Sequence, residues 1–330
     1  MISKKVKAVF VFFAFLSVLC NLVYGQGDKV CVQDVFSISD IEHVQDNRIA
    51  ILDNEGAKLI LYDTKEDKEI WRTGKQGEGP GEFVSPVDIA VNEDGSLVSI
   101  RDRNKRVSVF ESKTGKFKKS ITLPKTLVPN YEGFSYLSDN KYIIGGLKSS
   151  KYGKMVQVYE IDSSGYSSSF LDRTKKARRL GISSINDISI ALDGSKIYSL
   201  HQSDYVISES TPSGQVLRRH TPKYPKYFNE ISTSPPDKMD KIKSWIEGAS
   251  MTKGIHVLND SKLLSFVSPF GSSGGHIDVI SRKSFEITES IPIQGQLLDV
   301  NDGKLYILNK LSEKPNSCIR KVSYKNIFSD

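Results

Sequence analysis

The sequence is poor in the residues that build metal and redox centres. It holds three cysteines and five histidines in 330 residues, and no two of the histidines stand at the short spacing of a zinc motif. It also lacks a nucleophile elbow, a phosphate-binding Walker loop and a dinucleotide fingerprint. These absences exclude the enzyme classes that those motifs define.

Long apolar runs are absent except at the N-terminus. There Lys4, Lys5 and Lys7 precede the uncharged apolar run Ala8–Leu19, and the small residues before Gln26 suit a signal peptidase. The run is too short to cross a bilayer comfortably. We therefore predict a signal peptide over residues 1–25, which leaves no membrane span in the mature chain.

A second processing route would attach lipid to Cys20. The residue before a lipidated cysteine is normally small, whereas Leu19 stands there. This argues against lipoprotein anchoring through Cys20. The sequence thus predicts an exported protein of the periplasm or the cell surface.

No strong charge of one sign remains after cleavage. Removing residues 1–25 removes three of the 46 basic residues and no acid, so the mature charge is 43 − 39 = +4. The excess is dispersed along the chain, whereas nucleic-acid binding usually needs a concentrated basic stripe. We expect no nucleic-acid partner, and we expect a monomer.

What the sequence does contain is a repeat of about four strands. Its second strands share an apolar core and a polar end, and are Arg48–Asp53, Leu97–Asp102, Tyr142–Leu147, Lys196–His201, Leu263–Ser268 and Leu305–Lys310. The third strands share the same length, and are Leu59–Thr64, Val107–Ser112, Met155–Ile161, Val206–Thr211, His276–Arg282 and Cys318–Ser323. Five fourth strands follow glycine-bearing turns, as in hairpins, and are Glu69–Gly74, Phe117–Thr122, Tyr166–Leu171, Gln215–His220 and Phe285–Ser290.

The sixth unit lacks a fourth strand. The segment Lys29–Val35, just before the first unit, is strand-like and can complete it. This pairing closes the ring and removes exposed sheet edges. We therefore predict an all-β fold over residues 26–330, a six-bladed β-propeller whose ring is closed by the N-terminal strand.

Ring closure predicts a disulfide. Cys31 lies in the closing strand, Cys318 begins the third strand of unit six, and the two strands should be antiparallel neighbours. An exported protein meets an oxidising compartment. We expect a Cys31–Cys318 bond, with two buried free thiols as the alternative.

The interval between units four and five holds an insertion, residues 221–251. The residues Ser234-Pro235-Pro236-Asp237 suit a helix start, and Gly248 can end the helix. Ile246 falls on its apolar face, with Trp245 beside it. We predict one short amphipathic helix packed on a propeller face.

One connection carries a recognisable motif. Gly74–Phe83 (GKQGEGPGEF), followed by Pro86–Val91 and Asp94-Gly95, resembles the NHL-type repeat and, more closely, the TolB-like six-bladed propellers exported by Bacteroidota. The resemblance is sharp over residues 48–122 and architectural elsewhere. Related zinc lyases carry a histidine where this chain has Glu82, which counts against that activity. Since propellers host many functions, the resemblance implies the fold and leaves the activity open.

The candidate site is one mouth of the central channel. Asp40, Asp88 and Asp187 each lie seven residues before a first-strand turn, and His256 is a weaker addition. Carboxylates on separate strands could bind Ca²⁺ as a cofactor or act as acid and base. The simpler interpretation is that each aspartate accepts a backbone N–H where its strand begins.

A second feature is a basic loop between units three and four. Its residues are Arg173, Lys175, Lys176, Arg178 and Arg179. Such a cluster is usually a solvated surface, although it could bind an acidic glycan, a lipid head group or a partner.

Two functions remain open on the sequence alone. The first is a non-catalytic binding or scaffold propeller of the cell envelope that engages a protein, peptide or glycan. The alternative is a calcium-dependent hydrolase or lyase of lactonase-like type that uses Asp40, Asp88 and Asp187.

Overall fold

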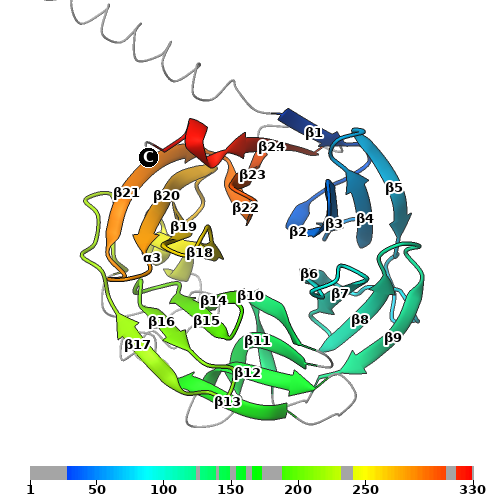
Figure 1. Cartoon of the computed structure of the whole chain (residues 1–330), viewed down its shortest axis with the longest axis horizontal. Coiled ribbons are helices and arrows are strands. Elements are labelled where there is room, and N and C mark those ends of the chain that lie inside the picture. Colours follow the sequence, from blue (N-terminus) through cyan, green and yellow to red (C-terminus); the bar gives the residue numbers. More distant parts are fainter. Residues whose placement is uncertain are drawn as a thin grey trace, which may run out of the picture.

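The chain forms a ring of six four-stranded antiparallel sheets around a central channel (Figure 1). The structure is a computed structural model that describes residues 28–123, 127–138, 141–148, 154–160, 166–172, 188–231, 241–309 and 317–328. In each sheet the first strand in chain order lies nearest the channel, except in the sheet that the N-terminal strand completes, where that strand lies at the outer edge (Figure 1). The predicted six-bladed propeller is confirmed.

The first three blades use consecutive strands. Their bounds are β2 Ile38–Gln45, β3 Arg48–Asp53, β4 Lys58–Asp63 and β5 Lys68–Thr73 in blade one; β6 Pro86–Val91, β7 Leu97–Asp102, β8 Arg106–Glu111 and β9 Phe117–Thr122 in blade two; and β10 Leu127–Ser138, β11 Lys141–Lys148, β12 Lys154–Glu160 and β13 Tyr166–Asp172 in blade three.

Blades four and five follow the same plan, and blade six borrows one strand. Their bounds are β14 Ile188–Asp193, β15 Lys196–His201, β16 Ile207–Ser210 and β17 Val216–His220; β18 Ser250–Val257, β19 Lys262–Pro269, β20 Gly274–Ser281 and β21 Ile287–Gln294; and β22 Gln296–Asn301, β23 Lys304–Asn309, β24 Ser317–Ser323 and β1 Asp28–Val32. A 3₁₀ turn, η3 Tyr324–Asn326, follows β24.

The ring closes as the sequence predicts. β1 pairs antiparallel with β24, with Cys31 directly opposite Cys318. The two cysteines form a disulfide, and their Cα atoms are 4.2 Å apart, near the spacing of a close antiparallel pair. The predicted bond is confirmed, and it ties the first strand of the ring to the last blade.

Apolar contacts between neighbouring blades form the core. In the described part of the chain, each of the six blade–blade boundaries has its own cluster of buried aliphatic and aromatic side chains. The second strands are buried on both faces, which explains their nearly continuous apolar runs. The fourth strands alternate partly buried and exposed positions because they form the outer rim.

Buried aspartates secure the loops that begin the first two blades. Asp53 accepts hydrogen bonds from the N–H groups of Phe36 (3.1 Å), Ser37 (2.9 Å) and Gly56 (3.1 Å). Asp102, equally inaccessible, accepts from Val84 (2.7 Å) and from Ser85. The carboxylates replace backbone partners that the irregular loops cannot provide.

The Gly74–Phe83 motif is a connector between blades. Phe83 is fully buried, and a side chain on Gly74 would collide with its ring. Arg106 donates to the carbonyl of Glu78 at 2.5 Å, and the Glu82 carboxylate accepts from the Gly79 N–H at 2.8 Å. These contacts give the motif a structural role.

Trp71 likewise joins blades: its Nε1 donates to the Ser112 carbonyl at 2.8 Å.

The insertion contains a short helix, as predicted. Its helix, α3, spans Ile242–Ile246, and Gly248 follows with a φ of +75°. Ile246 is buried beside Ile231, with Trp245 against the same cluster. The predicted helix start at Ser234–Asp237 lies outside the described residues. Because β18 already begins at Ser250, the last two residues of the predicted insertion belong to blade five.

The closing strand β1 ends at Val32, three residues before its predicted end at Val35. The larger difference is in blade five. The fourth strand of blade five runs from Ile287 to Gln294, whereas the sequence predicts Phe285–Ser290. Phe285 adopts a φ of +61° in the turn, and its ring is buried under the Arg218 guanidinium, 3.6 Å from the ring centroid. The aromatic residue therefore fills the boundary between blades four and five instead of starting a strand.

Candidate functional site

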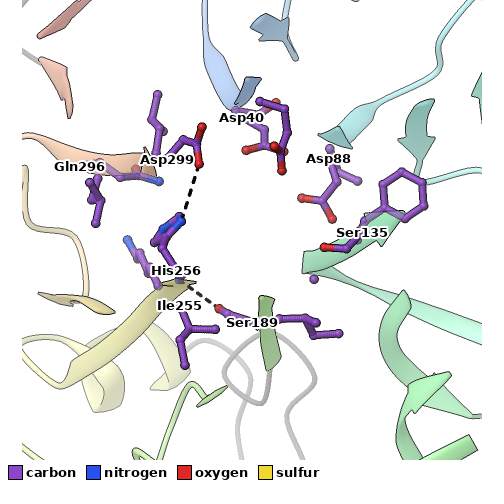
Figure 2. A pocket seen from close by; sticks show the side chains of 18 of the residues that line it. Asp40, Asp88, Ser135, Ser189, Ile255, His256, Gln296 and Asp299 are labelled. Atoms are coloured by element: carbon purple, nitrogen blue, oxygen red, sulfur yellow. Dashed lines mark hydrogen bonds and ion pairs between the residues drawn. The ribbon is translucent and has the colours of Figure 1, made fainter. Parts of the chain in front are cut away.

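The channel opens on the face where the first strand of each blade begins, which we call the mouth face. A cavity of about 250 Å³ lies at this opening, and a second of about 260 Å³ continues along the channel. The two share six lining residues: Glu42, Ser135, Ile190, Ile255, His256 and Asp299. Figure 2 shows that the labelled polar side chains point into the space from several blades.

Asp40 lies at the channel mouth as predicted, and its two oxygens are both engaged. One accepts the N–H of Ile41 at 2.9 Å, and the other accepts the N–H of Ile89 in blade two at 2.8 Å. Burial raises the pKa of Asp40 well above its ordinary value, and the neighbouring Asp88 carboxylate adds to the rise. Asp40 therefore accepts a backbone N–H, as in the simpler of the two interpretations, and it links blade one to blade two.

Asp88 also lies at the mouth, but it is held by a cation. The fully buried Arg101 guanidinium donates to Asp88 through Nε at 3.2 Å and through a second, shorter bond from Nη2. Burial raises the pKa of Asp88, and Arg101 opposes the rise. The predicted pair Asp40 and Asp88 is thus brought together, with each carboxylate already engaged.

Asp187, the third predicted acid, lies outside the described residues. The strand register nevertheless shows which residue of blade four corresponds to Asp40. Asp40 is opposite Leu52 and Ser189 is opposite Leu200, at the same position of the second strand. The sequence alignment placed this position two residues too early. One residue comes from the bulge of β2 between His43 and Gln45, which the regular register of β14 lacks. The other comes from aligning Asn47, the second residue of its turn, with Gly194, the first residue of its turn.

Ser189 performs the same task as Asp40. Its Oγ accepts the N–H of Gly254 in blade five at 3.0 Å, and Figure 2 marks this contact. A first-strand side chain again clasps the next blade.

A deeper layer of the channel was missed by the sequence analysis. Glu42, His256 and Asp299 lie opposite Ala50, Leu264 and Tyr306, which are equivalent positions of three adjacent blades. Only His256 had been singled out. The signal was available: each of the three is an ionisable residue on the strand that borders the channel, and such residues are uncommon in the interior of a protein.

The electrostatics of this layer are dominated by burial. Burial raises the pKa of Asp299 to about 6, although its Oδ1 accepts the Val300 N–H at 2.6 Å. Burial lowers the pKa of His256 to about 4, so the imidazole is neutral at pH 7. The His256 Nδ1–Asp299 Oδ1 separation of 4.0 Å is then not an ion pair.

Glu42 stands apart within this layer. Burial, together with the charges of Asp299 and Asp40, raises its pKa well above the ordinary value. No hydrogen bond or ion pair to its carboxyl is found within the described residues. Glu42 is therefore the acid of the channel that is not engaged in holding the blades.

The calcium site predicted from Asp40, Asp88 and Asp187 stays a prediction, because Asp187 lies outside the described residues. Among the described residues, no three histidine, cysteine, aspartate or glutamate side chains are grouped as metal ligands. Asp40 already accepts two N–H groups, and Asp88 is paired with the Arg101 cation.

Gln296, the blade-six counterpart of Asp40, also lines the mouth. The basic loop, Arg173, Lys175, Lys176, Arg178 and Arg179, lies outside the described residues.

Comparison with known families now identifies the fold family. Residues 28–239 match the DUF5128 family, described as a 6-bladed beta-propeller. The chain belongs to this family. The membership confirms the propeller and names no activity.

Solved structures repeat the ring at low sequence identity. A DUF4221 family member from Bacteroides vulgatus is 11% identical with a TM-score of 0.62, and the match covers 89% of this chain and 97% of that chain. A Bacteroides fragilis protein, named as a candidate exported protein, is 12% identical with a TM-score of 0.60 and coverages of 88% and 91%. The WD40 repeats of RRP9 are 11% identical with a TM-score of 0.55 and coverages of 89% and 98%. At such identities these likenesses show the fold alone.

No curated protein matches the sequence. Among the described residues, no helix is long and apolar enough to cross a membrane.

Proposed function

We propose that this propeller is an exported, non-catalytic binding protein of the cell envelope whose channel mouth receives a cationic side chain of a peptide or protein partner. A signal peptide over residues 1–25 would direct the protein to the periplasm or the cell surface and would then be removed. The observation that carries the proposal is Glu42, a channel carboxyl that has no partner among the described residues while its neighbours hold the blades together.

A cation suits this position on electrostatic grounds. The channel brings Asp40, Glu42 and Asp299 close enough to raise the pKa of Glu42. An entering ammonium or guanidinium group supplies the opposite charge, lowers that pKa and releases a proton. The effective dielectric constant inside the channel is lower than in bulk water, so an ion pair with Glu42 is stronger there than on the protein surface.

Binding is favoured over catalysis because three polar groups at the channel mouth have structural roles. Asp40 and Ser189 accept N–H groups of neighbouring blades, and Asp88 pairs with Arg101. A catalytic acid or nucleophile must instead be free to reach the reacting atoms.

The test is calorimetric titration of the mature protein with trilysine amide. We expect binding with proton release, measured as a heat that depends on the ionisation enthalpy of the buffer. Glu42→Gln should abolish that dependence and weaken binding about tenfold, a loss of about 1.4 kcal/mol. The matched control is Glu66→Gln, an exposed residue in the turn between β4 and β5. No binding by the wild type, or equal binding by both variants, contradicts the proposal.

A further inference from the structure

A third cavity lies away from the two in the channel, on the mouth face of blade five. Its volume of about 340 Å³ falls within the range of small-molecule sites. It is bounded by the end of β19, the start of β20, the end of β21, the first residue of β18 and Tyr227 of the insertion. Its lining residues are Tyr227, Ser250, Val267, Pro269, Ser272, Ser273, Gly274, Gly275, His276, Pro292, Ile293 and Gln294.

The cavity exists because two paired strands separate. β19 and β20 pair as far as Val267 and His276. Beyond that point Pro269 pairs only with β18, and Gly274 and Gly275 pair only with β21. Side chains cannot refill the gap at either glycine: a Cβ on Gly275 would lie 2.1 Å from the Val267 carbonyl oxygen, and one on Gly274 would lie 2.7 Å from that of Ile293.

One wall of the cavity is rigidly held. The rings of Tyr227 and His276 stack in parallel, with centroids 3.7 Å apart and an angle of 3° between their planes. The Tyr227 hydroxyl donates to the fully buried Asp278 and lies 2.8 Å from the Ser290 hydroxyl. Tyr205 donates to the same carboxylate at 2.6 Å. A ligand therefore meets a surface that needs no reorganisation.

The polar groups of the cavity define a chemical class. None of the lining residues is acidic or cationic by type, apart from His276, whose pKa burial lowers from its ordinary value. The hydroxyls of Ser250 and Ser272 are engaged with backbone groups. Within the described residues, this leaves the Ser273 hydroxyl, the Gln294 carboxamide and the His276 imidazole without partners.

Each of these three groups can both donate and accept a hydrogen bond. A sugar hydroxyl can also both donate and accept, so it can form a hydrogen bond with any of these groups as donor or as acceptor. Beside them the half-buried Pro269 and the exposed Pro292 supply apolar surface for the C–H face of a ring. A charged ligand would find no counter-ion here, in contrast to the acidic channel.

From this complementarity we propose that the blade-five cavity binds a neutral sugar residue of a glycan, held by Ser273, His276 and Gln294 against the apolar wall. The site is separate from the channel and uses none of its residues. The propeller would then engage two chemically different ligands on one face.

The experiment is titration of the mature protein with four neutral trisaccharides, built respectively from glucose, galactose, mannose and N-acetylglucosamine. We expect at least one to bind. Gln294→Ala should weaken that binding about tenfold, and because Gln294 is exposed its loss should leave the melting temperature unchanged. His276→Ala is the second variant, with the intact fold checked by circular dichroism.

Two controls separate this site from the channel. Glu42→Gln should bind the trisaccharide as the wild type does, and Gln294→Ala should bind trilysine amide as the wild type does. Ser213→Ala, in the exposed turn between β16 and β17, should change neither. Failure of all four trisaccharides, or unchanged binding by both Gln294→Ala and His276→Ala, overturns the proposal.

Discussion

At the scale of single residues, the buried aspartates of this protein are mainly structural. Asp53 and Asp102 hold the loops that begin blades, Asp40 clasps one blade to the next, and Asp278 fixes three hydroxyl groups. Each carboxylate satisfies donors that a sheet cannot reach. Removing one therefore leaves several buried N–H or O–H groups without acceptors, which is costlier than losing a single hydrogen bond.

Asp53→Ala tests this role directly. It removes the acceptor of the Phe36, Ser37 and Gly56 N–H groups, so we expect the free energy of unfolding to fall by roughly 2–4 kcal/mol. Urea denaturation measures the change. Asp260→Ala, in an exposed turn, is the control and should stay within about 0.5 kcal/mol of the wild type. Similar losses in both variants would show that the loop clamp is unimportant.

Asp299 makes stability depend on pH. Burial raises its pKa to about 6 from an ordinary 3.8, so the folded state binds the proton more tightly than the unfolded state. The stabilising effect of protonation is complete below pH 3.8 and is lost as the pH rises through 6. We expect Asp299→Asn to gain on the order of 2–3 kcal/mol relative to wild type between pH 4 and pH 7. Urea unfolding at both pH values checks this, and a constant difference between the proteins would contradict it.

At the scale of elements, the insertion packs in two places. Its aromatic residues join the core between blades four and five: Tyr224 and Phe228 stack with centroids 4.8 Å apart, and Phe228 packs against Tyr205 of blade four. Ile246 belongs to a second small cluster with Ile231 and the start of β18. Because this cluster is small and separate from the cores between the blades, its stability should be local.

Ile246→Ala examines that local stability. Truncating this buried side chain typically costs 2–5 kcal/mol of packing energy. We expect faster amide hydrogen exchange at residues 241–251, with exchange in blades one and two unchanged. Mass-spectrometric hydrogen exchange resolves the two regions. A uniform acceleration over the whole chain would mean that the insertion unfolds only with the ring.

At the scale of the whole molecule, the ring is held closed by one strand and one covalent bond. β1 completes the sheet of blade six, and the Cys31–Cys318 disulfide spans 287 residues. Unfolding with the bond intact leaves a large covalent loop, which restricts the unfolded chain.

The double variant Cys31→Ser/Cys318→Ser tests the closure. The loop-entropy treatment predicts that the free energy of unfolding falls by about 5.7 kcal/mol, with strain or residual structure reducing the effect. Denaturant titration of both proteins gives the value. Titration of the denatured, unreduced wild type should find no free thiol after removal of residues 1–25. Two titratable thiols would contradict the bond.

The sequence by itself determined the ring. Alternating apolar strands and glycine turns recur along the chain, and the missing fourth strand of unit six predicted both the closure by Lys29–Val35 and the opposition of Cys31 and Cys318. These features depend on local patterns and on short hairpins, which hold their register.

Only the tertiary structure decided which side chains meet in the channel. Some first strands carry bulges and others, such as β14, do not. Spacing along the chain therefore placed Asp187 where Ser189 corresponds to Asp40, and it overlooked Glu42 and Asp299. Tertiary contacts also showed that Asp40 and Asp88 are engaged by a backbone N–H and by Arg101. These partners lie in another blade or on another strand, and no pattern within one strand encodes them.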